Sequence, residues 1–300
     1  MRIVLHIGRH KTGTTAIQAW FADRYEELLR SRKVLYPRAG RSQEDRDELR
    51  NLHHGLILPI LDGDQERSAE LLGELREEIE RTRPEVILLS SEVLSRETLT
   101  RDDFHRLRSL LPSLPTQIVV YLRRQGDVLT SRYAERVKRG YVAWPATIAD
   151  VEADVCLDYL KALEPASDVY GRENLVVRSY DLERDNIVAG FLAACGLDVP
   201  GATGDEYRRN VRPAWSTIEL LRLANGLPSP VRARTIRLVR RVGRIARSTP
   251  LARWLDRPIP LKPAERDRII RACESSNREV EKLYFGGREV FPRAPFRRQD

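Results

Sequence analysis

The sequence predicts an α/β fold in which a central parallel sheet is flanked by helices and followed by a mainly helical C-terminal region. Two patterns predict it. Continuous aliphatic runs, typical of strands buried on both faces, recur along the first part of the chain. Segments with apolar residues at helical spacing separate these runs. Strands that alternate with helices are typical of parallel sheets with right-handed crossovers.

The elements follow one another in this order. Residues 2–5 form a strand, and a glycine-bearing turn leads into a helix with Ile17, Trp20 and Phe21 at helical spacing. A short strand in RKVLYPRAG, an apolar helix in NLHHGLILPILDG with Pro59 near its end, and a charged helix over 68–81 come next. Three strands follow, in PEVILLSSE, PTQIVVYLRR and ENLVVRSYD. From about residue 210 the chain is predicted to be helical and basic, as an extension of a single domain over 1–300.

Composition narrows the class of protein. With 300 residues, 41% hydrophobic and 32% charged, the chain is typical of a soluble globular protein with a sizeable core. No apolar stretch approaches the roughly 20 residues of a membrane span, and no leader pattern precedes the first strand, so we expect a cytoplasmic protein. Cys156, Cys195 and Cys273 lack the spacing of a disulfide framework or a zinc site and are predicted to be buried thiols. The net charge of +8 favours anionic partners.

The turn after the first strand reads HIGRHKTGTTAIQAWF. Gly8 and Gly13 have the spacing of the phosphate loop G-x-x-x-x-G-K-[ST], but Lys11 stands before the second glycine instead of after it. This difference counts against a magnesium-dependent kinase or NTPase. A P-loop-type turn at a helix N-terminus still points backbone N–H groups at an anion. Backbone donors and hydroxyls of Thr12, Gly13, Thr14 and Thr15 would surround one phosphate. Lys11 would reach toward the group being transferred.

A second motif follows a later strand. The segment VVYLRRQGDVLTSRY places Arg123, Asp127 and Ser131 in the pattern R-x-x-x-D-x-x-x-S at a helix start. With KTGTT at residues 11–15, the sequence resembles the sulfotransferases that use 3′-phosphoadenosine 5′-phosphosulfate, and within them the bacterial and carbohydrate-type members. The segments YGRENLVVRSYDLERD, YRRNVRPAWSTIELLRLAN and ESSNREVEKLYFGG also look like bacterial members, so the resemblance covers most of the chain.

The resemblance implies a ligand set. Lys11 and the four residues after it would bind the 5′-phosphosulfate, while Arg123 and Ser131 would bind the 3′-phosphate, with Arg124 as the alternative arginine. Tyr180 is the candidate to pack on adenine, or else a core tyrosine at a strand end. The product would be 3′,5′-ADP, and no metal is required.

Two kinds of residue are candidates for the base that takes the acceptor proton. Glu92 follows a buried strand directly, at the edge where ligands of open α/β sheets bind. Carbohydrate-type sulfotransferases use a glutamate in a similar place, whereas the soluble small-molecule enzymes use a histidine. His53 and His54 are the alternatives here, although a histidine on an apolar segment is more often a packed core residue.

The basic segment VRARTIRLVRRVGRIAR has seven arginines and no acid, and Val231, Leu238, Val242 and Ile245 fall near one helical face. It is either an ordinary solvated helix or a landing surface for an anionic acceptor or an anionic membrane. Nucleic acid is not expected, since no recognised binding module accompanies the charge. The sequence thus predicts an enzyme that transfers a sulfuryl group to a hydroxyl of a carbohydrate, lipid-linked or small-molecule acceptor. The alternatives are a kinase-like phosphotransferase and a catalytically silent nucleotide-binding module.

Overall fold

The computed structural model describes residues 1–9, 11–41, 51–143, 145–152, 157–202, 214–247 and 261–295. The chain divides into two compact units. The first comprises Met1–Arg123, Asp158–Arg209 and Ser276–Val290, and the second comprises Arg124–Leu157, Asn210–Ser275 and Phe291–Asp300. The expectation of one domain over 1–300 stays a prediction.

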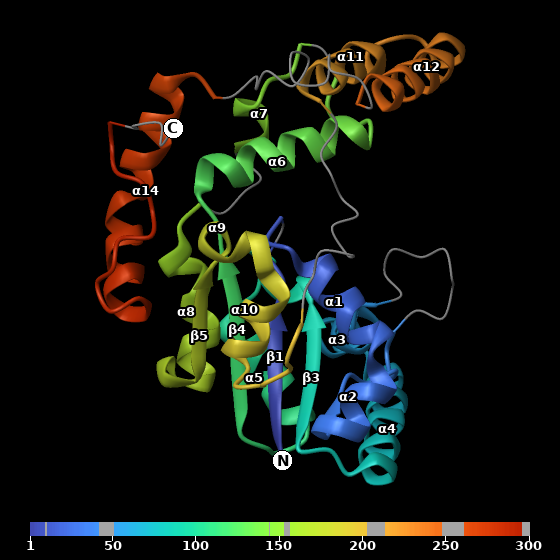
Figure 1. Ribbon diagram of the computed structural model, residues 1–300, viewed down its shortest axis with the longest axis vertical. Coiled ribbons are helices and arrows are strands. Elements are labelled where there is room, and N and C mark those ends of the chain that lie inside the picture. Colours follow the sequence, from blue (N-terminus) through green and yellow to red (C-terminus); the bar gives the residue numbers. More distant parts are fainter. Residues whose placement is uncertain are drawn as a thin grey trace. The chain divides into compact units, whose positions relative to one another are not determined.

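A five-stranded parallel sheet forms the centre of the first unit, with strand order β2-β3-β1-β4-β5 (Figure 1). This confirms the predicted parallel sheet. Ile7 at the end of β1 lies opposite Ser91 of β3 on one side and Val120 of β4 on the other, so the carboxyl ends of neighbouring strands meet at one edge. The strands are β1 (Arg2–Ile7), β2 (Val34–Leu35), β3 (Val86–Ser91), β4 (Thr116–Leu122) and β5 (Leu175–Ser179).

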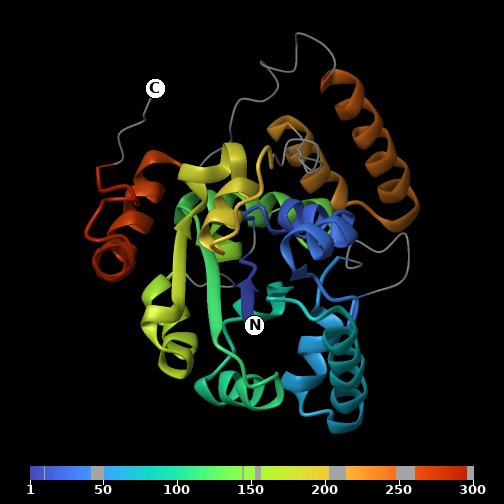
Figure 2. The ribbon, with the colours of Figure 1, turned by 60° about the horizontal axis from the view of Figure 1, so that its bottom comes forward.

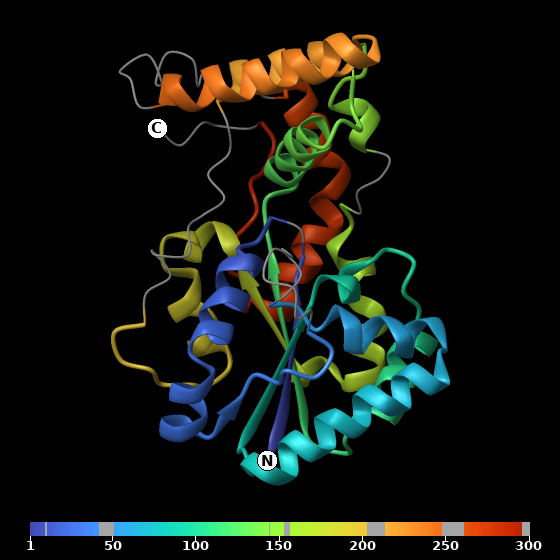
Figure 3. The same cartoon turned by 90° about the vertical axis from the view of Figure 1, so that its right-hand side faces the viewer.

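Helices cover both faces of this sheet (Figure 3). On one face, Trp20 and Phe21 of α1 and Phe191 of α10 pack in a buried cluster with Val4 of β1 and Val119 of β4. The other face is covered by α3, α5 and α8, with α4 packed on α3. The helices of this unit are α1 (Thr14–Asp23), α2 (Tyr25–Arg32), α3 (His54–Asp62), α4 (Gln65–Thr82), α5 (Arg101–Leu110), α8 (Tyr159–Tyr170), α9 (Tyr180–Glu183) and α10 (Ile187–Ala194), with the 3-10 turns η1 (Glu92–Ser95), η2 (Arg172–Asn174) and η3 (Arg184–Asn186).

Local sequence signals explain where several of these helices begin. The carboxylate of Asp64 accepts a hydrogen bond from the backbone N–H of Arg67 and caps α4. Thr100 and Asp103 form a capping box at the start of α5. Both helices bury their apolar residues. For α4 this agrees with the leucine spacing of the charged helix predicted over 68–81.

The second unit is helical in its described part, which confirms the predicted character of the C-terminal region. α11 and α12 pack side by side (Figure 1 and Figure 2), and Ile236 and Val239 of α12 lie against a cluster that includes Trp215 and Ile218. A smaller cluster joins Leu129 to Ile269. The helices here are α6 (Gln125–Lys138), α7 (Ala149–Glu152), α11 (Trp215–Asn225), α12 (Ser229–Arg247) and the first part of α14 (Pro263–Tyr284).

Two further expectations concern the whole chain. Cys195 and Cys273 are buried free thiols, as predicted, while Cys156 lies outside the described residues. Among the described helices, none has the length and apolar character needed to cross a membrane.

Candidate active site

Four of the predicted site residues of the first unit come shortly after the ends of four neighbouring strands, which Figure 1 shows. The loop after β1 contains Lys11, Glu92 follows β3, Arg123 follows β4, and Tyr180 follows β5. β1 lies between β3 and β4. After β1 the chain first forms β2 and β3 on one side of it and then β4 and β5 on the other side, which makes the end of β1 the point where the strand order reverses. Ligands of open α/β sheets bind at such a switch point.

The loop between β1 and α1 has an unusual backbone. Lys11 has a φ of 66° and Gly13 a φ of 78°, both in the left-handed region. For a residue other than glycine this conformation costs roughly 1–2 kcal/mol, and such residues cluster at functional sites. His10 lies outside the described residues. The position of the strained lysine agrees with a binding role for the loop.

Two of the three threonine hydroxyls of the loop form hydrogen bonds within the loop itself. Oγ1 of Thr12 and Oγ1 of Thr14 both donate to the carbonyl oxygen of Arg9, at 2.7 and 3.3 Å, and both threonines are buried. Thr15 is exposed at the start of α1. The donors left for an anion are therefore chiefly the backbone N–H groups of the first turn of α1, together with the Thr15 hydroxyl.

Arg123 and Tyr180 contact this loop from one side. Nη1 of Arg123 donates to the carbonyl oxygen of Lys11 at 3.0 Å, and the guanidinium carbon lies 5.0 Å from the centre of the Tyr180 ring. A Cβ on Gly13 would stand 3.3 Å from Cε2 of Tyr180. Lys11, Gly13, Arg123 and Tyr180 are thus brought together, with the face of the tyrosine ring against the arginine. The role of Tyr180 toward adenine stays a prediction.

Glu92 contacts the same loop at its first glycine. It is the first residue of η1, and its Cγ would lie 3.0 Å from a Cβ placed on Gly8. The hydroxyl of the preceding Ser91 accepts from the backbone N–H of Val93 at 3.3 Å and so caps the turn that carries Glu92. The carboxylate stem therefore stands directly against the predicted phosphate loop.

The two candidate histidines have different surroundings. Nδ1 of half-buried His54 lies 3.0 Å from the hydroxyl of Ser91, next to Glu92. His53 is fully buried, its Nδ1 accepts from the backbone N–H of Ser90 at 3.0 Å, and its Nε2 lies 2.9 Å from the carbonyl oxygen of Pro37. Burial lowers the pKa of His53 to about 3. With both ring nitrogens bonded to backbone, His53 is a structural residue and not a base, whereas His54 stays an alternative to Glu92.

A buried polar cluster, which was not predicted from the sequence, lies beside the loop. Nδ1 of His6 lies 2.8 Å from the hydroxyl of Ser90, which also accepts from Nε2 of Gln18 at 2.9 Å, and all three residues are buried. Burial lowers the pKa of His6 to about 3. His6 and Ser90 are register partners on β1 and β3, one residue before the strands end. A signal was present in the sequence, since each is a polar residue inside an apolar run.

Arg9 and Tyr159 were missed as well. The guanidinium carbon of Arg9 lies 5.0 Å from the centre of the Tyr159 ring, and the hydroxyl of Tyr159 donates to the carbonyl oxygen of Arg123. Arg9 is thus a second loop cation, held on a ring that also fixes the residue after β4. Arginine and tyrosine are too common for either to stand out in the sequence.

Ser131 and Asp127 lie on α6, in the second unit. Asp127 pairs with Arg266 of α14, with 3.6 Å between the carboxylate oxygen and Nη1. Within this unit the aspartate of the second motif therefore connects two helices. A shared 3′-phosphate site of Arg123 and Ser131 stays a prediction.

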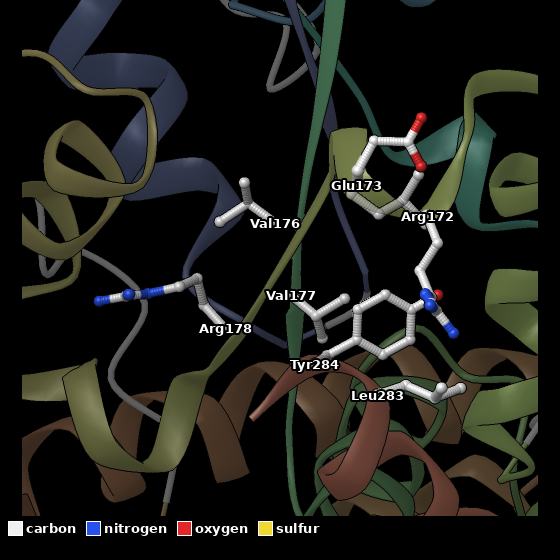
Figure 4. Close-up of a pocket in the computed structure, with 8 residues that line it drawn as sticks. Arg172, Glu173, Val176, Val177, Arg178, Leu283 and Tyr284 are labelled. Carbon is white, nitrogen blue, oxygen red and sulfur yellow. The ribbon is translucent and has the colours of Figure 1, made fainter. Parts of the chain in front are cut away.

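A hollow of about 410 Å³ lies beside the edge strand β5 (Figure 4). Val176 and Arg178 point to one side of the strand, and Val177 and Tyr284 to the other. None of the predicted site residues lines it. In the described part of the chain, no three His, Cys, Asp or Glu side chains gather as a metal site requires.

Comparisons with solved structures find distant structural relatives, among them the following two. The chain is similar to the sulfotransferase from Alicyclobacillus acidocaldarius, with 17% identity and a TM-score of 0.42 over 80% of this chain and 98% of that one. It is also similar to the sulfotransferase domain from the curacin biosynthetic pathway, with 10% identity and a TM-score of 0.38 over 67% and 75% of the two chains. No protein-family model and no curated protein matches the sequence.

Proposed function

We propose that this protein is a sulfotransferase that moves a sulfuryl group from 3′-phosphoadenosine 5′-phosphosulfate to a hydroxyl of an acceptor. The observation that carries the proposal is the loop after β1. Its Lys11 carbonyl accepts from Arg123, its Gly13 lies against Tyr180, and Glu92 stands against Gly8, three residues before the KTGTT motif. A cation for the leaving group, a cation for a second phosphate and a carboxylate for the acceptor are what such a transfer requires.

The donor is bound by charge and by backbone. The N-terminus of α1 offers its N–H groups to the 5′-phosphate, and Lys11 lies on the loop that precedes it. Arg123 supplies a guanidinium for the 3′-phosphate, the group that distinguishes this donor from ATP. Ser131 is the proposed second ligand of that phosphate.

The transfer is in line. The acceptor oxygen forms a bond to sulfur while the bond between sulfur and the bridging phosphate oxygen breaks. Glu92 takes the proton of the acceptor hydroxyl, and the ammonium of Lys11 stabilises the charge that develops on the leaving 3′,5′-ADP. By analogy with phosphoryl transfer, positioning and electrostatics supply most of the rate.

The proposed acceptor presents a nucleophilic group to the sulfur. A hydroxyl of a carbohydrate, a lipid-linked molecule or a small alcohol is proposed, with an amine as the lesser alternative. The excess of positive charge on the chain favours an acceptor or product that is anionic.

The proposal is tested with sulfur-labelled donor and a panel of glycans, lipids and small alcohols, in the presence of EDTA. We expect label on one acceptor class and release of 3′,5′-ADP, and strong loss of both with Lys11→Ala. An absolute requirement for Mg²⁺ would favour a phosphotransferase instead. Tight binding of 3′,5′-ADP with no transfer to any acceptor would indicate a silent nucleotide-binding module.

A further inference from the structure

The exposed apolar side chains of the described residues are concentrated in one place. Four of them, Met1, Leu110, Tyr141 and Leu182, are scattered over the chain. The other large ones all lie in the hairpin of α11 and α12: Leu220, Leu223, Leu227, Val231, Leu238, Val242 and Ile245. Single exposed apolar residues are ordinary, but a concentration of them marks an interaction surface.

α12 has two apolar sides, and the described residues cover only one of them. Ile236 and Val239 pack against the cluster around α11. The exposed apolar face consists of Val231, Leu238, Val242 and Ile245, which are 51% to 61% exposed and spaced seven, four and three residues apart. This spacing keeps the four side chains along one line of the helix. The four residues share one face of α12, as their spacing in the sequence predicts.

Arginines border the exposed apolar face. Arg234 and Arg241 lie four residues before and three after Leu238, which makes them its neighbours on the helix surface. Arg237 lies further round the same side. None of these three exposed arginines, nor Arg232, forms an ion pair with a described residue. The helix contains no acid over its length.

We propose that α12 binds the surface of an anionic lipid bilayer, with the exposed apolar face inserted at the headgroup boundary and the arginines on lipid phosphates. A long helix that combines a polar, cationic side with an aliphatic stripe lies in the interface and does not cross it. Arginine stems can follow the apolar boundary while the guanidinium stays at the phosphate level. The surface belongs to the second unit, and its binding to lipid does not depend on sulfuryl transfer.

Charge complementarity favours the bilayer over the other occupants. A second copy of the chain would bring unpaired arginines against one another, and like charges that face each other are unfavourable. A nucleic acid would satisfy the arginines but would leave the aliphatic stripe exposed to water. An anionic membrane satisfies both features at once.

The test is co-sedimentation of the full-length protein with vesicles of phosphatidylcholine alone and with 30% phosphatidylglycerol, without nucleotide. We expect binding only to the anionic vesicles, weakened by salt because the Debye length shortens. The triple variant Arg234→Gln, Arg237→Gln, Arg241→Gln should bind on the order of 100-fold more weakly, at about fivefold for each arginine. The triple variant Arg30→Gln, Arg32→Gln, Arg76→Gln removes the same charge from exposed positions of the first unit and should bind as wild type.

The contribution of the exposed apolar face to vesicle binding is tested separately, with a control substitution at an exposed leucine of the first unit. Leu238→Gln with Val242→Gln should weaken vesicle binding on the order of tenfold, since each loses the burial of a half-exposed aliphatic side chain. Leu110→Gln, at an exposed leucine elsewhere, should not. The proposal is overturned if the two vesicle types bind equally, or if the α12 variants bind as wild type. It is equally overturned if the wild type binds no vesicle while the α12 variants abolish a dimer in solution or binding to a nucleic acid.

Discussion

The loop after β1 and helix α12 both present positive charge, but they hold it in different ways. Beside the loop, the guanidinium of Arg123 is fixed by the Lys11 carbonyl and the Tyr180 ring. On α12, Arg234 and Arg241 are exposed and have no acid partner among the described residues. Fixed cations can distinguish where a phosphate sits on a small ligand, because little freedom is lost on binding. Exposed arginines respond instead to the charge density of a surface and are screened by salt.

The largest effect that separates the two regions is expected at Glu92. Glu92→Gln keeps the size of the side chain but removes its basicity, so the rate of transfer should fall roughly 10²- to 10⁴-fold. The affinity for 3′,5′-ADP and the binding to anionic vesicles should stay close to wild type. Single-turnover transfer of label and equilibrium binding measure the two quantities.

Glu97→Gln is the matched control, since it removes an exposed carboxylate five residues further along the chain. His54→Ala tests the alternative base. If transfer stays normal in Glu92→Gln and is lost in His54→Ala, the histidine takes the proton and the carbohydrate-type assignment of the acceptor fails with it.

The next effect sharpens the difference between fixed and exposed arginines. Arg123→Ala removes a charge-assisted contact worth roughly 1.5–3 kcal/mol, so 3′,5′-ADP should bind about 10- to 150-fold more weakly. Binding of 5′-AMP, which lacks the 3′-phosphate, should change far less. Titration calorimetry with both nucleotides measures this, and Arg124→Ala tests the alternative arginine in the same way. Equal losses for the two nucleotides would mean that Arg123 does not bind the 3′-phosphate.

The buried histidines of the first unit predict an acid-sensitive fold. Burial holds the pKa of His6 and His53 at about 3, so both stay neutral in the folded protein at pH 5. In the unfolded chain they bind protons below about pH 6.5. The unfolded state therefore takes up more protons, and each histidine should lower the free energy of unfolding by up to about 2 kcal/mol between pH 7 and pH 5.

Urea unfolding at the two pH values measures this dependence. His53→Gln should reduce it by the contribution of one histidine, whereas His105→Gln, at an exposed histidine, should leave it unchanged. A pH dependence that is the same in wild type and His53→Gln would show that His53 is not held neutral by burial.

The smallest effect is expected on the exposed face of α12. Leu238→Gln with Val242→Gln should change the free energy of unfolding by no more than about 0.5 kcal/mol per site, because neither side chain packs in the unit. Ile218→Ala, at a fully buried residue that packs in the α11 cluster, should cost about 2–5 kcal/mol. A large loss in the α12 variant would mean that this face is covered in the protein.

The elements were predictable because their signals are local. Apolar runs marked every strand, and the spacing of Leu71, Leu72 and Leu75 marked α4. Strand ends also predicted where Glu92, Arg123 and Tyr180 would lie, since parallel strands end at one edge.

The side-chain contacts that the sequence could not predict depend on which strands are neighbours in the sheet. The contact between His6 and Ser90 exists only because β1 pairs with β3, an order that apolar runs do not encode. The structural role of His53 likewise depends on the backbone of Pro37 and Ser90, which no spacing rule connects to it. Contacts between residues that are distant in the sequence are set by tertiary packing. A histidine that acts as a base and one that is buried for structural reasons therefore look alike in the sequence.

The packing at Gly8 limits how the loop can vary. A Cβ at residue 8 would stand 2.5 Å from Cγ2 of Thr14, so the two positions compete for the volume of one methyl group. Thr14→Ser would vacate that volume and keep the hydroxyl that donates to Arg9. Gly8→Ala should therefore abolish transfer alone and recover part of it when combined with Thr14→Ser. A side chain at residue 8 is therefore expected only together with a smaller residue at position 14.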